Sequence, residues 1–441
     1  MKRLVYAWLR ALSALDRFLG DRLTKAGWLL LAAGSAAGAA GIDTGQTLTY
    51  QAFTFAAALL ALAALASLPF RARVAIERDL PRYATAGERF DYALRVTNRG
   101  ARALDGVTAR ERFRDARPGF DEWRRAREPG EEQRNWFDRN AGYFRWRWLI
   151  ERRLPERPEE APLPRLAPGE QASVRLSMTP RRRGRISLEG VTLGRADPLG
   201  LVRGLARVRL EARVTALPRR YRLPGLALSG RRKFQPGGVS LAASVGDSEE
   251  FLMLREYRPG DPLHRVHWKS FARAGKPVVK EFQDEFFERH ALVLDTSTDR
   301  GEDQAFEAAV ALAASFVCTL DTQECLLDLL FVGGEVRLYT AGRGQLHAEH
   351  MLEVLAGVSP SPPAEFEALA RAVLAQRGRL SSCIAVLLGW DAPRQEFVRA
   401  LGASGLDARA LLLCDAEPAG LPHNVFPLVP GRIEQGLARL R

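Results

Sequence analysis

The sequence predicts a multidomain protein built from a two-helix transmembrane hairpin, an all-β domain and an α/β domain. Three patterns in the 441 residues indicate this. Two uncharged apolar segments lie close together near the amino end, at residues 26–42 and 47–70. Residues 71–220 contain short runs that alternate between apolar and polar side chains, as half-buried strands do. Residues 286–441 alternate between short apolar runs and helical stretches, which is typical of a parallel sheet covered by helices.

The amino-terminal region has the features of a membrane anchor. Residues 1–25 form a basic amphipathic segment, with cations at Lys2, Arg3, Arg10, Arg17, Arg22 and Lys25. Each apolar segment that follows is close to the roughly 20 residues that cross a bilayer. The connector 43–46 carries no positive charge, whereas Arg71 and Arg73 follow directly. Positive charge favours the cytoplasmic side, so we expect both termini and the main domains in the cytoplasm. A cleaved signal peptide is the alternative, and the second apolar segment argues against it.

The all-β domain is predicted at residues 71–220 as an immunoglobulin-like sandwich. Its strand candidates are separated by turn residues and lie at 90–96, 172–178, 186–193 and 207–217. Short alternating strands with such turns are typical of this architecture.

An insertion rich in Arg and Trp interrupts the predicted sandwich at residues 110–160. Aromatic and basic residues nearly alternate at 143–150, which predicts a strand. This mixture suits stacking on nucleic acid bases or placement at a lipid headgroup layer. A half-buried hairpin whose Trp residues pack on the sandwich is the structural alternative. Among the functional alternatives, a membrane-surface role is favoured because the chain is already tethered there.

The α/β domain is predicted at residues 286–441, after a linker and a charged segment at 221–285. Its strand candidates are 290–294, 326–331, 336–339, 383–388 and 408–414, and its helix candidates are 302–320, 366–375, 394–403 and 433–440. This alternation indicates a mostly parallel, Rossmann-type sheet with helices on both faces.

The charged segment before the α/β domain has turn and helix signals in a fixed order. Pro259-Gly260 predicts a turn, and Asp261 followed by Pro262 predicts the start of a helix that runs to Arg273. Gly275 is the expected C-cap. The helix would carry a basic stripe of Arg265, Lys269 and Arg273. Arg255 and Asp261 could also pair, which would give the segment a purely architectural role.

These residues resemble the signature of a known family. The run Arg255-Glu-Tyr257-x-Pro-Gly260-Asp261, followed by Arg265-x-x-Trp268-Lys269 and Ala-Arg273, is similar to that of the domain-of-unknown-function fifty-eight (DUF58) family. His267 stands where many members have Asp. The element Arg183-Gly184-Arg185, followed by Asp197-Pro-Leu199-Gly-Leu, also resembles the family, with Leu199 in place of an aromatic residue.

The resemblance implies a bacterial inner-membrane protein that docks a MoxR-type AAA+ ATPase, with a transglutaminase-like membrane protein as another associate. On this interpretation the chain is a non-catalytic scaffold. The signature residues Arg255, Tyr257, Gly260, Asp261, Arg265, Trp268, Lys269 and Arg273 are then the partner-binding candidates.

A second resemblance concerns the loop after the first strand of the α/β domain. Asp295-Thr-Ser297-Thr-Asp299 is similar to the metal-ion-dependent adhesion site, Asp-x-Ser-x-Ser, of von Willebrand factor A domains. Such a site would hold Mg²⁺ with oxygen ligands. Asp299 replaces the second Ser, Asp391 could serve the third loop, and Thr340 is a poor candidate for the second. The motif is degenerate, and Asp295 and Ser297 could instead be loop anchors; no other cofactor is expected.

Composition narrows the remaining function classes. The net charge of +13 comes mainly from Arg, and no nucleic-acid-binding motif accompanies it. The four cysteines lack C-x-x-C spacing, which argues against zinc and against a disulfide framework. No catalytic constellation is recognisable. Two alternatives to the scaffold stay open: a metal-dependent hydrolase that uses Asp295, Asp299, Asp391 and the His264/His267 pair, and a lipid- or nucleic-acid-binding protein that uses the insertion.

Overall fold

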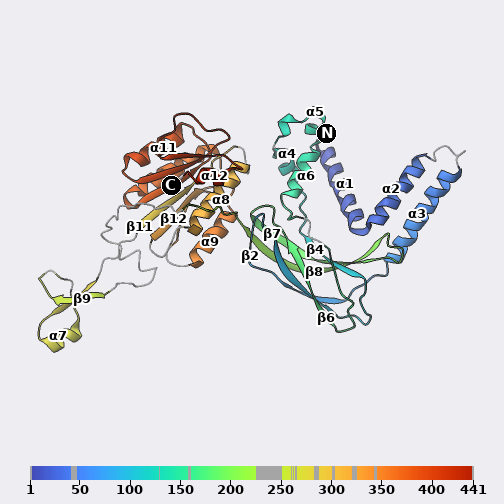
Figure 1. The fold of residues 1–441 in the computed structure, drawn as a ribbon, viewed down its shortest axis with the longest axis horizontal. Helices are drawn as coiled ribbons and strands as arrows, with labels where there is room; N and C mark the ends of the chain where they lie inside the picture. Colours follow the sequence, from blue (N-terminus) through green and yellow to red (C-terminus); the bar gives the residue numbers. More distant parts are fainter. Residues whose placement is uncertain are drawn as a thin grey trace. The chain divides into compact units, whose positions relative to one another are not determined.

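The computed structural model describes most of the chain, in two compact units, Met1–Arg219 and Arg220–Arg441 (Figure 1). The described residues are 2–40, 47–128, 130–156, 160–224, 251–259, 261, 263, 266–282, 288–299, 303–319, 325–341 and 345–439. Each unit has its own hydrophobic core.

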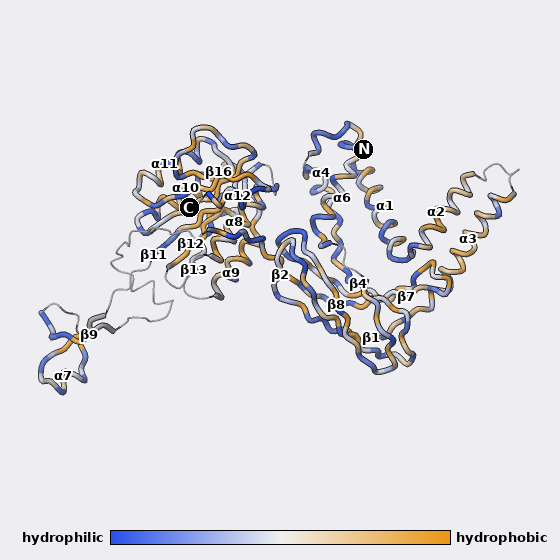
Figure 2. Tube along the Cα trace, viewed as in Figure 1, coloured by the Kyte–Doolittle hydropathy of each residue, from blue (hydrophilic) through white to orange (hydrophobic). Residues whose placement is uncertain are grey.

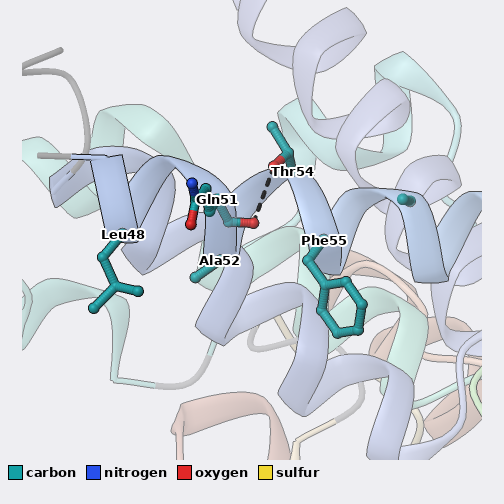
Figure 3. Close-up of a pocket in the computed structure, with 6 residues that line it drawn as sticks. Leu48, Gln51, Ala52, Thr54 and Phe55 are labelled. Carbon is teal, nitrogen blue, oxygen red and sulfur yellow. Dashed lines mark hydrogen bonds between the residues drawn. The ribbon is translucent and has the colours of Figure 1, made fainter.

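The first unit begins with three helices, α1 (Lys2–Arg22), α2 (Lys25–Ala40) and α3 (Thr47–Ser67). Small residues let α2 and α3 approach closely, since a Cβ at Gly34 would lie 3.0 Å from that of Ala56. Of the two predicted spans, one helix among the described residues, Leu48–Ser67, is long and apolar enough to cross a membrane. Figure 2 colours most of α2 and α3 in the apolar range. Leu48 and Phe55 are exposed and project from the same side of α3, and Thr54 donates a hydrogen bond to the Gln51 carbonyl (Figure 3).

The predicted immunoglobulin-like sandwich is present as two facing sheets. One sheet has the order β1-β3-β6, formed by β1 (Val74–Asp79), β3 (Phe90–Asn98) and β6 (Gln171–Met178). The other has the order β2-β8-β7-β4-β5, formed by β2 (Tyr83–Thr85), β4 (Val107–Phe113), β5 (Ala161–Pro162), β7 (Gly184–Ala196) and β8 (Arg203–Leu217). Every second residue of β3 is buried, so both sheets contribute alternate side chains to one core.

The insertion contains helices at its centre, including one at residues 143–150, so the strand predicted there is wrong. It contains α4 (Phe120–Arg125), the 3₁₀ turn η1 (Glu131–Gln133), α5 (Trp136–Ala141) and α6 (Tyr143–Glu151). Trp146 and Leu149 are three residues apart, which brings them to one face of α6, and both are buried against Trp123 of α4 and Leu9 of α1. The near-alternation of aromatic and basic residues was compatible with the two-residue period of a strand and with the 3.6-residue period of a helix. Packing on α1 favours the helix.

The second unit contains a six-stranded sheet with the order β13-β12-β11-β14-β15-β16. Its strands are β11 (Glu288–Leu294), β12 (Cys325–Val332), β13 (Val336–Ala341), β14 (Ser382–Leu387), β15 (Asp407–Leu413) and β16 (Val425–Leu428). All neighbouring strands are parallel except β12 and β13, which form an antiparallel pair at one edge. This order is that of a doubly wound sheet. The sequence predicts the mostly parallel, Rossmann-type sheet but not the order of its strands.

Helices cover both faces of this sheet. They are α8 (Gln304–Thr319), α9 (Gln345–Ala356), α10 (Phe366–Gln376), α11 (Ala392–Ala403) and α12 (Ile433–Leu437), with 3₁₀ turns η4 (Pro363–Glu365) and η5 (Arg377–Arg379). Residues of α10 and α11 share a core with Ala291 and Val293, while α8 contacts β11 from the face of Leu292 and Leu294. Helix α9 and strand β16 were not predicted from the sequence.

The DUF58-like segment forms a hairpin, which we call the signature hairpin: β9 (Phe251–Glu256), α7 (Trp268–Ala274) and β10 (Val278–Phe282). The helix predicted from Pro262 begins only at Trp268. Val266 forms a β-bridge with Val279, and the His267 N–H donates to the Val278 carbonyl. The backbone at these two residues therefore pairs with β10 and does not form a helix. Gly275 ends α7 in the left-handed conformation with φ 66°, as predicted.

Candidate functional site

The carboxyl end of β11 is a switch point of the sheet. The chain passes from β11 to β12 on one side and later returns to β14 on the other. In doubly wound sheets this arrangement opens a crevice in which ligands bind. The loop that begins at Asp295 lies at this point, beside the loop that leads from β14 into α11.

Asp295 is fully buried and its carboxylate is saturated with hydrogen bonds. Oδ2 accepts from Arg394 Nε at 2.7 Å and from the Leu388 N–H at 2.9 Å. Oδ1 accepts from the Ser297 N–H at 2.9 Å. Because the carboxylate is enclosed, it presents no charge to a partner.

Arg394 forms the centre of the site. Beyond Asp295, its guanidinium donates to Asp391 Oδ2 at 2.5 Å and to the Ser297 carbonyl at 2.7 Å, and it lies over the Phe366 ring at 4.6 Å. The side chain is 5% exposed. Burial by itself would lower the pKa of Arg394, but the Asp295 and Asp391 carboxylates together more than offset this and raise the pKa above its ordinary value.

A pair of buried hydroxyl-bearing loops completes the edge. Ser361 Oγ lies 3.1 Å from Thr296 Oγ1 and 3.1 Å from Ser297 Oγ. The Ser361 N–H donates to the Thr296 carbonyl at 2.8 Å, and the Thr298 N–H donates to the Ser361 carbonyl at 2.9 Å. The loop after β11 is therefore held to the loop that precedes α10.

The donor set does not fit Mg²⁺. Of the four residues predicted to bind it, Asp295 and Asp391 are engaged by the Arg394 guanidinium, Ser297 is bonded to Ser361, and Asp299 is exposed. Thr340 donates to Asp328 Oδ1 instead. The described residues contain no cluster of three or more His, Cys, Asp or Glu with ligand geometry. A fixed guanidinium thus supplies the positive charge at this edge, and the magnesium hypothesis stays a prediction.

The sequence predicts a helix that begins at Arg394 but did not indicate a role for this residue. A signal for it was present. Arg394 lies in the first turn of α11, where Asp391 is the N-cap, and a cation there opposes the helix dipole. An arginine at such a position indicates a nearby anion. Ser361 had no comparable signal, because only the folded chain brings it to Ser297.

A surface pocket of about 530 Å³ adjoins this edge, between the β12–β13 turn and the chain that links α9 to η4. It is lined in part by Phe331, Arg337, Tyr339, Glu353, Ser361 and Glu365. The Phe331 and Tyr339 rings are stacked, with centroids 5.9 Å apart. One carboxylate oxygen of Glu365 is buried without a hydrogen-bond partner. The pocket thus combines a flat aromatic wall with both signs of charge.

In the signature hairpin, Arg255 and Asp261 form a bidentate ion pair, with N–O distances of 2.7 and 2.8 Å. Asp261 also accepts the Arg258 N–H at 2.8 Å. The hydrogen bonds from Arg255 and from that N–H lower the pKa of Asp261 to about 2. The Tyr257 N–H donates to the Pro277 carbonyl at 2.9 Å. The pairing considered from the sequence is therefore present and ties the turn to β9.

The remaining signature residues separate into two groups. Trp268 is 62% exposed and contacts Phe271 edge to face, and Lys269 and Arg273 are also exposed. His267 Nδ1 lies 2.7 Å from Ser270 Oγ within the same helix region. Gly260, Arg265 and His264 lie outside the described residues, so the basic stripe is described at Lys269 and Arg273 alone.

Comparisons with known proteins bear on this second unit. Residues 253–423 match the family model described as "Protein of unknown function DUF58". The "Uncharacterized protein YeaD" of Bacillus subtilis (strain 168) is 27% identical over 186 residues, which are 42% of this chain and 44% of that protein. The match thus spans less than half of the relative's length.

Two solved structures share features with about a third of the chain. The CARDB domain of PF1109 from Pyrococcus furiosus is 11% identical, with 32% of this chain and 93% of that chain covered and a TM-score of 0.16. The ASH / PapD-like domain of human CEP192 is 11% identical, with 34% and 91% covered and a TM-score of 0.16. These scores are too low to carry an argument about function.

Proposed function

Residues 253–423 carry the DUF58 domain and place the chain in that family, and on this premise we propose that it is a membrane-anchored, non-catalytic adaptor. The α/β unit is von Willebrand factor A-like in this proposal. Its partner is a MoxR-type AAA+ ATPase, as the family resemblance implies, and a transglutaminase-like membrane protein is a further associate.

Anchoring in this proposal is by both α2 and α3, with their connector outside and the domains in the cytoplasm. The length and composition of α3 support this, as does the close packing of α2 against it at Gly34 and Gly38. The basic residues that flank the pair, Lys25 before it and Arg71 after it, favour the cytoplasmic side for both ends.

The observation that carries the docking proposal is the exposed face of α7. It presents the aromatic Trp268 next to the cations Lys269 and Arg273, and the hairpin that holds it is braced by the Arg255–Asp261 pair. Trp and Arg, both exposed on this short helix, are residue types enriched in interface hot spots. The chemistry that it fits is an acidic surface with an apolar recess.

The carboxyl edge of the sheet supports a metal-independent mode of docking. The Arg394 guanidinium neutralises Asp295 internally, so the edge does not need an ion to complete it. The pocket beside this edge is a second contact region, suited to a side chain that can stack on Tyr339.

Co-purification with the ATPase tests the proposal. The full chain is purified from native membranes in mild detergent, with ATP and Mg²⁺ present, as wild type, Trp268→Ala and the double variant Lys269→Glu/Arg273→Glu. We expect the ATPase with wild type only. Loss of a central aromatic hot spot costs about 2 kcal/mol or more, which corresponds to roughly 30-fold in affinity.

Lys276→Glu is the matched control. Lys276 is exposed in the same hairpin, follows the C-cap of α7 and pairs with Glu256 at 3.4 Å. It should retain the ATPase. If the three variants behave alike, or if no ATPase is recovered with wild type, the docking proposal is wrong and the pocket at the sheet edge becomes the surface to examine.

A further inference from the structure

Helix α1 has a wide apolar surface, and other parts of the protein cover only some of it. At about 100° per residue, its aliphatic and aromatic side chains occupy roughly two thirds of the circumference. One part of this surface is packed within the fold and an adjoining part faces outward. The two parts differ in what they touch, and the outward part has no described protein neighbour that buries it.

The covered part of α1 packs on the insertion. Leu9 is buried against Trp123, Trp146 and Leu149, and the Tyr6 hydroxyl donates to the Pro118 carbonyl at 3.1 Å. Arg17 pairs with Asp115 at 3.0 Å. These contacts fix the rotation of α1 about its own axis, so the outward part is a defined face.

The outward part is a row of large apolar side chains on an arc of about 120°. It consists of Leu4 (76% exposed), Trp8 (63%), Leu12 (40%), Leu15 (52%) and Phe18 (53%). We call this row the apolar stripe. It extends over four turns of the helix, and single exposed apolar residues on ordinary surfaces do not form such a continuous row.

The stripe is continuous with the membrane anchor. Only Leu23 and Thr24 separate α1 from α2, and they are pinned to the turn before β8: the Thr24 N–H donates to the Leu201 carbonyl at 3.0 Å. Gly27 allows this close approach, because a Cβ there would lie 2.2 Å from the Leu201 carbonyl oxygen. The first turn of α2 and the carboxyl end of α1 are therefore both held next to the sandwich, at the turn before β8.

Charge distinguishes a lipid surface from other occupants. Residues 2–25 hold six basic and two acidic side chains, and Arg3 and Arg10 lie on the flank of the helix away from the stripe. Near an anionic leaflet each Lys or Arg contributes about 1 kcal/mol of attraction. A basic helix with Leu, Trp and Phe on one face is the composition of helices that lie in the headgroup region.

From these observations we infer that α1 is an interfacial helix whose apolar stripe is buried in the headgroup and upper acyl region of an anionic membrane. The inference rests on the proposed anchoring through α2 and α3. The insertion then links α1 to the sandwich. Its helix α5 carries the exposed Trp136 and Phe137.

Spin labels on the full chain test this placement. The four native cysteines are first replaced, and a nitroxide is attached at Leu15→Cys or Leu4→Cys in the stripe, at Arg10→Cys on the exposed flank about 140° from Leu15, or at Phe55→Cys in α3. The protein is reconstituted in vesicles of phosphatidylethanolamine and phosphatidylglycerol. Collision rates with O₂, which concentrates in lipid, and with a water-soluble nickel chelate are then measured.

We expect O₂ collisions to exceed nickel collisions several-fold at both stripe positions and at Phe55, and the reverse at Arg10. High nickel accessibility at the stripe, with Phe55 in lipid, would overturn the inference while leaving the anchor intact. Low accessibility of the stripe to both reagents would also overturn it, because a protein partner or a second copy would then cover the stripe. If Phe55 itself is reached by nickel, the proposed anchor fails first.

Discussion

Arg394 and Asp295 form a charge pair that is costly to break at one partner alone. Their side chains are 5% and 0% exposed, so each would be left as an uncompensated buried charge without the other. The energetic consequence is asymmetric, since removing both charges together leaves only a cavity and some unpaired N–H groups. This residue pair therefore decides whether the switch point is an ion pair or a metal site.

We predict that Arg394→Ala lowers the free energy of unfolding of the α/β unit by about 3–5 kcal/mol. The double variant Arg394→Ala/Asp295→Ala should lose less than the sum of the single variants, in a double-mutant cycle measured by urea denaturation. Arg399→Ala is the control, because Arg399 lies on the same helix in an exposed pair with Glu396 and should cost under about 1 kcal/mol. Equal costs at the two arginines would contradict this assignment.

The wild type and an Asp295→Ala variant also test whether Mg²⁺ binds at this edge of the sheet. Because the guanidinium engages both Asp295 and Asp391, we expect added Mg²⁺ to leave the unfolding midpoint of the wild type unchanged. A midpoint that rises with Mg²⁺ in the wild type and fails to rise in Asp295→Ala would restore the magnesium hypothesis.

At the scale of elements, the signature hairpin shows why a motif can be predicted while its structure is not. The turn, the Arg255–Asp261 pair and the Gly275 C-cap were all readable as local signals. The helix start was not, because Pro262 and Asp261 give the ordinary signals of a helix amino terminus. The antiparallel bridge between Val266 and Val279, which are 13 positions apart in sequence, overrides them.

The brace of this hairpin should be lost in acid. The folded-state pKa of Asp261 is about 2, below its ordinary value of 3.8. The stabilisation is therefore fully present above pH about 4 and declines as pH falls toward 2, because the unfolded state then binds the proton first. We predict that Asp261→Asn lowers the stability of the hairpin at neutral pH and that this difference becomes small as the pH falls to about 2.

Hydrogen exchange of the β9 and β10 amides in the two proteins, measured across this pH range with correction for intrinsic exchange, checks the prediction. A difference between wild type and Asp261→Asn that persists unchanged at pH 2 would show that the variant acts through some contact other than the ion pair with Arg255.

At the scale of the molecule, two units with separate cores imply two unfolding events. Leu94 is fully buried in the sandwich core, and Leu387 is fully buried in the core of the α/β unit. We predict two transitions by calorimetry in detergent. Leu94→Ala should lower the midpoint temperature of only one transition, and Leu387→Ala that of only the other. Each variant should lower the free energy of unfolding of its own unit by about 2–5 kcal/mol. A single transition that both variants shift equally would show that the units unfold together.

Local periodicity by itself determined the two main architectures. Alternation at 90–96 and 172–178 gave strands with one buried face, and the apolar runs at 290–294 and 383–388 gave strands buried on both faces. The order of these elements along the chain then implied a sandwich followed by a doubly wound sheet. The signature residues likewise identified the family, because their spacing is specific without any contact.

Tertiary structure decided everything that depends on residues far apart in sequence. Arg394 reaches Asp295 across 99 positions, and Ser361 reaches Ser297 across 64. Residues 143–150 became a helix because α1 offered a complementary face, and the same packing left the stripe of Leu4, Trp8 and Phe18 outward. The physical reason is that burial and pairing are properties of the assembled surface, whereas periodicity reports only which faces are available for burial.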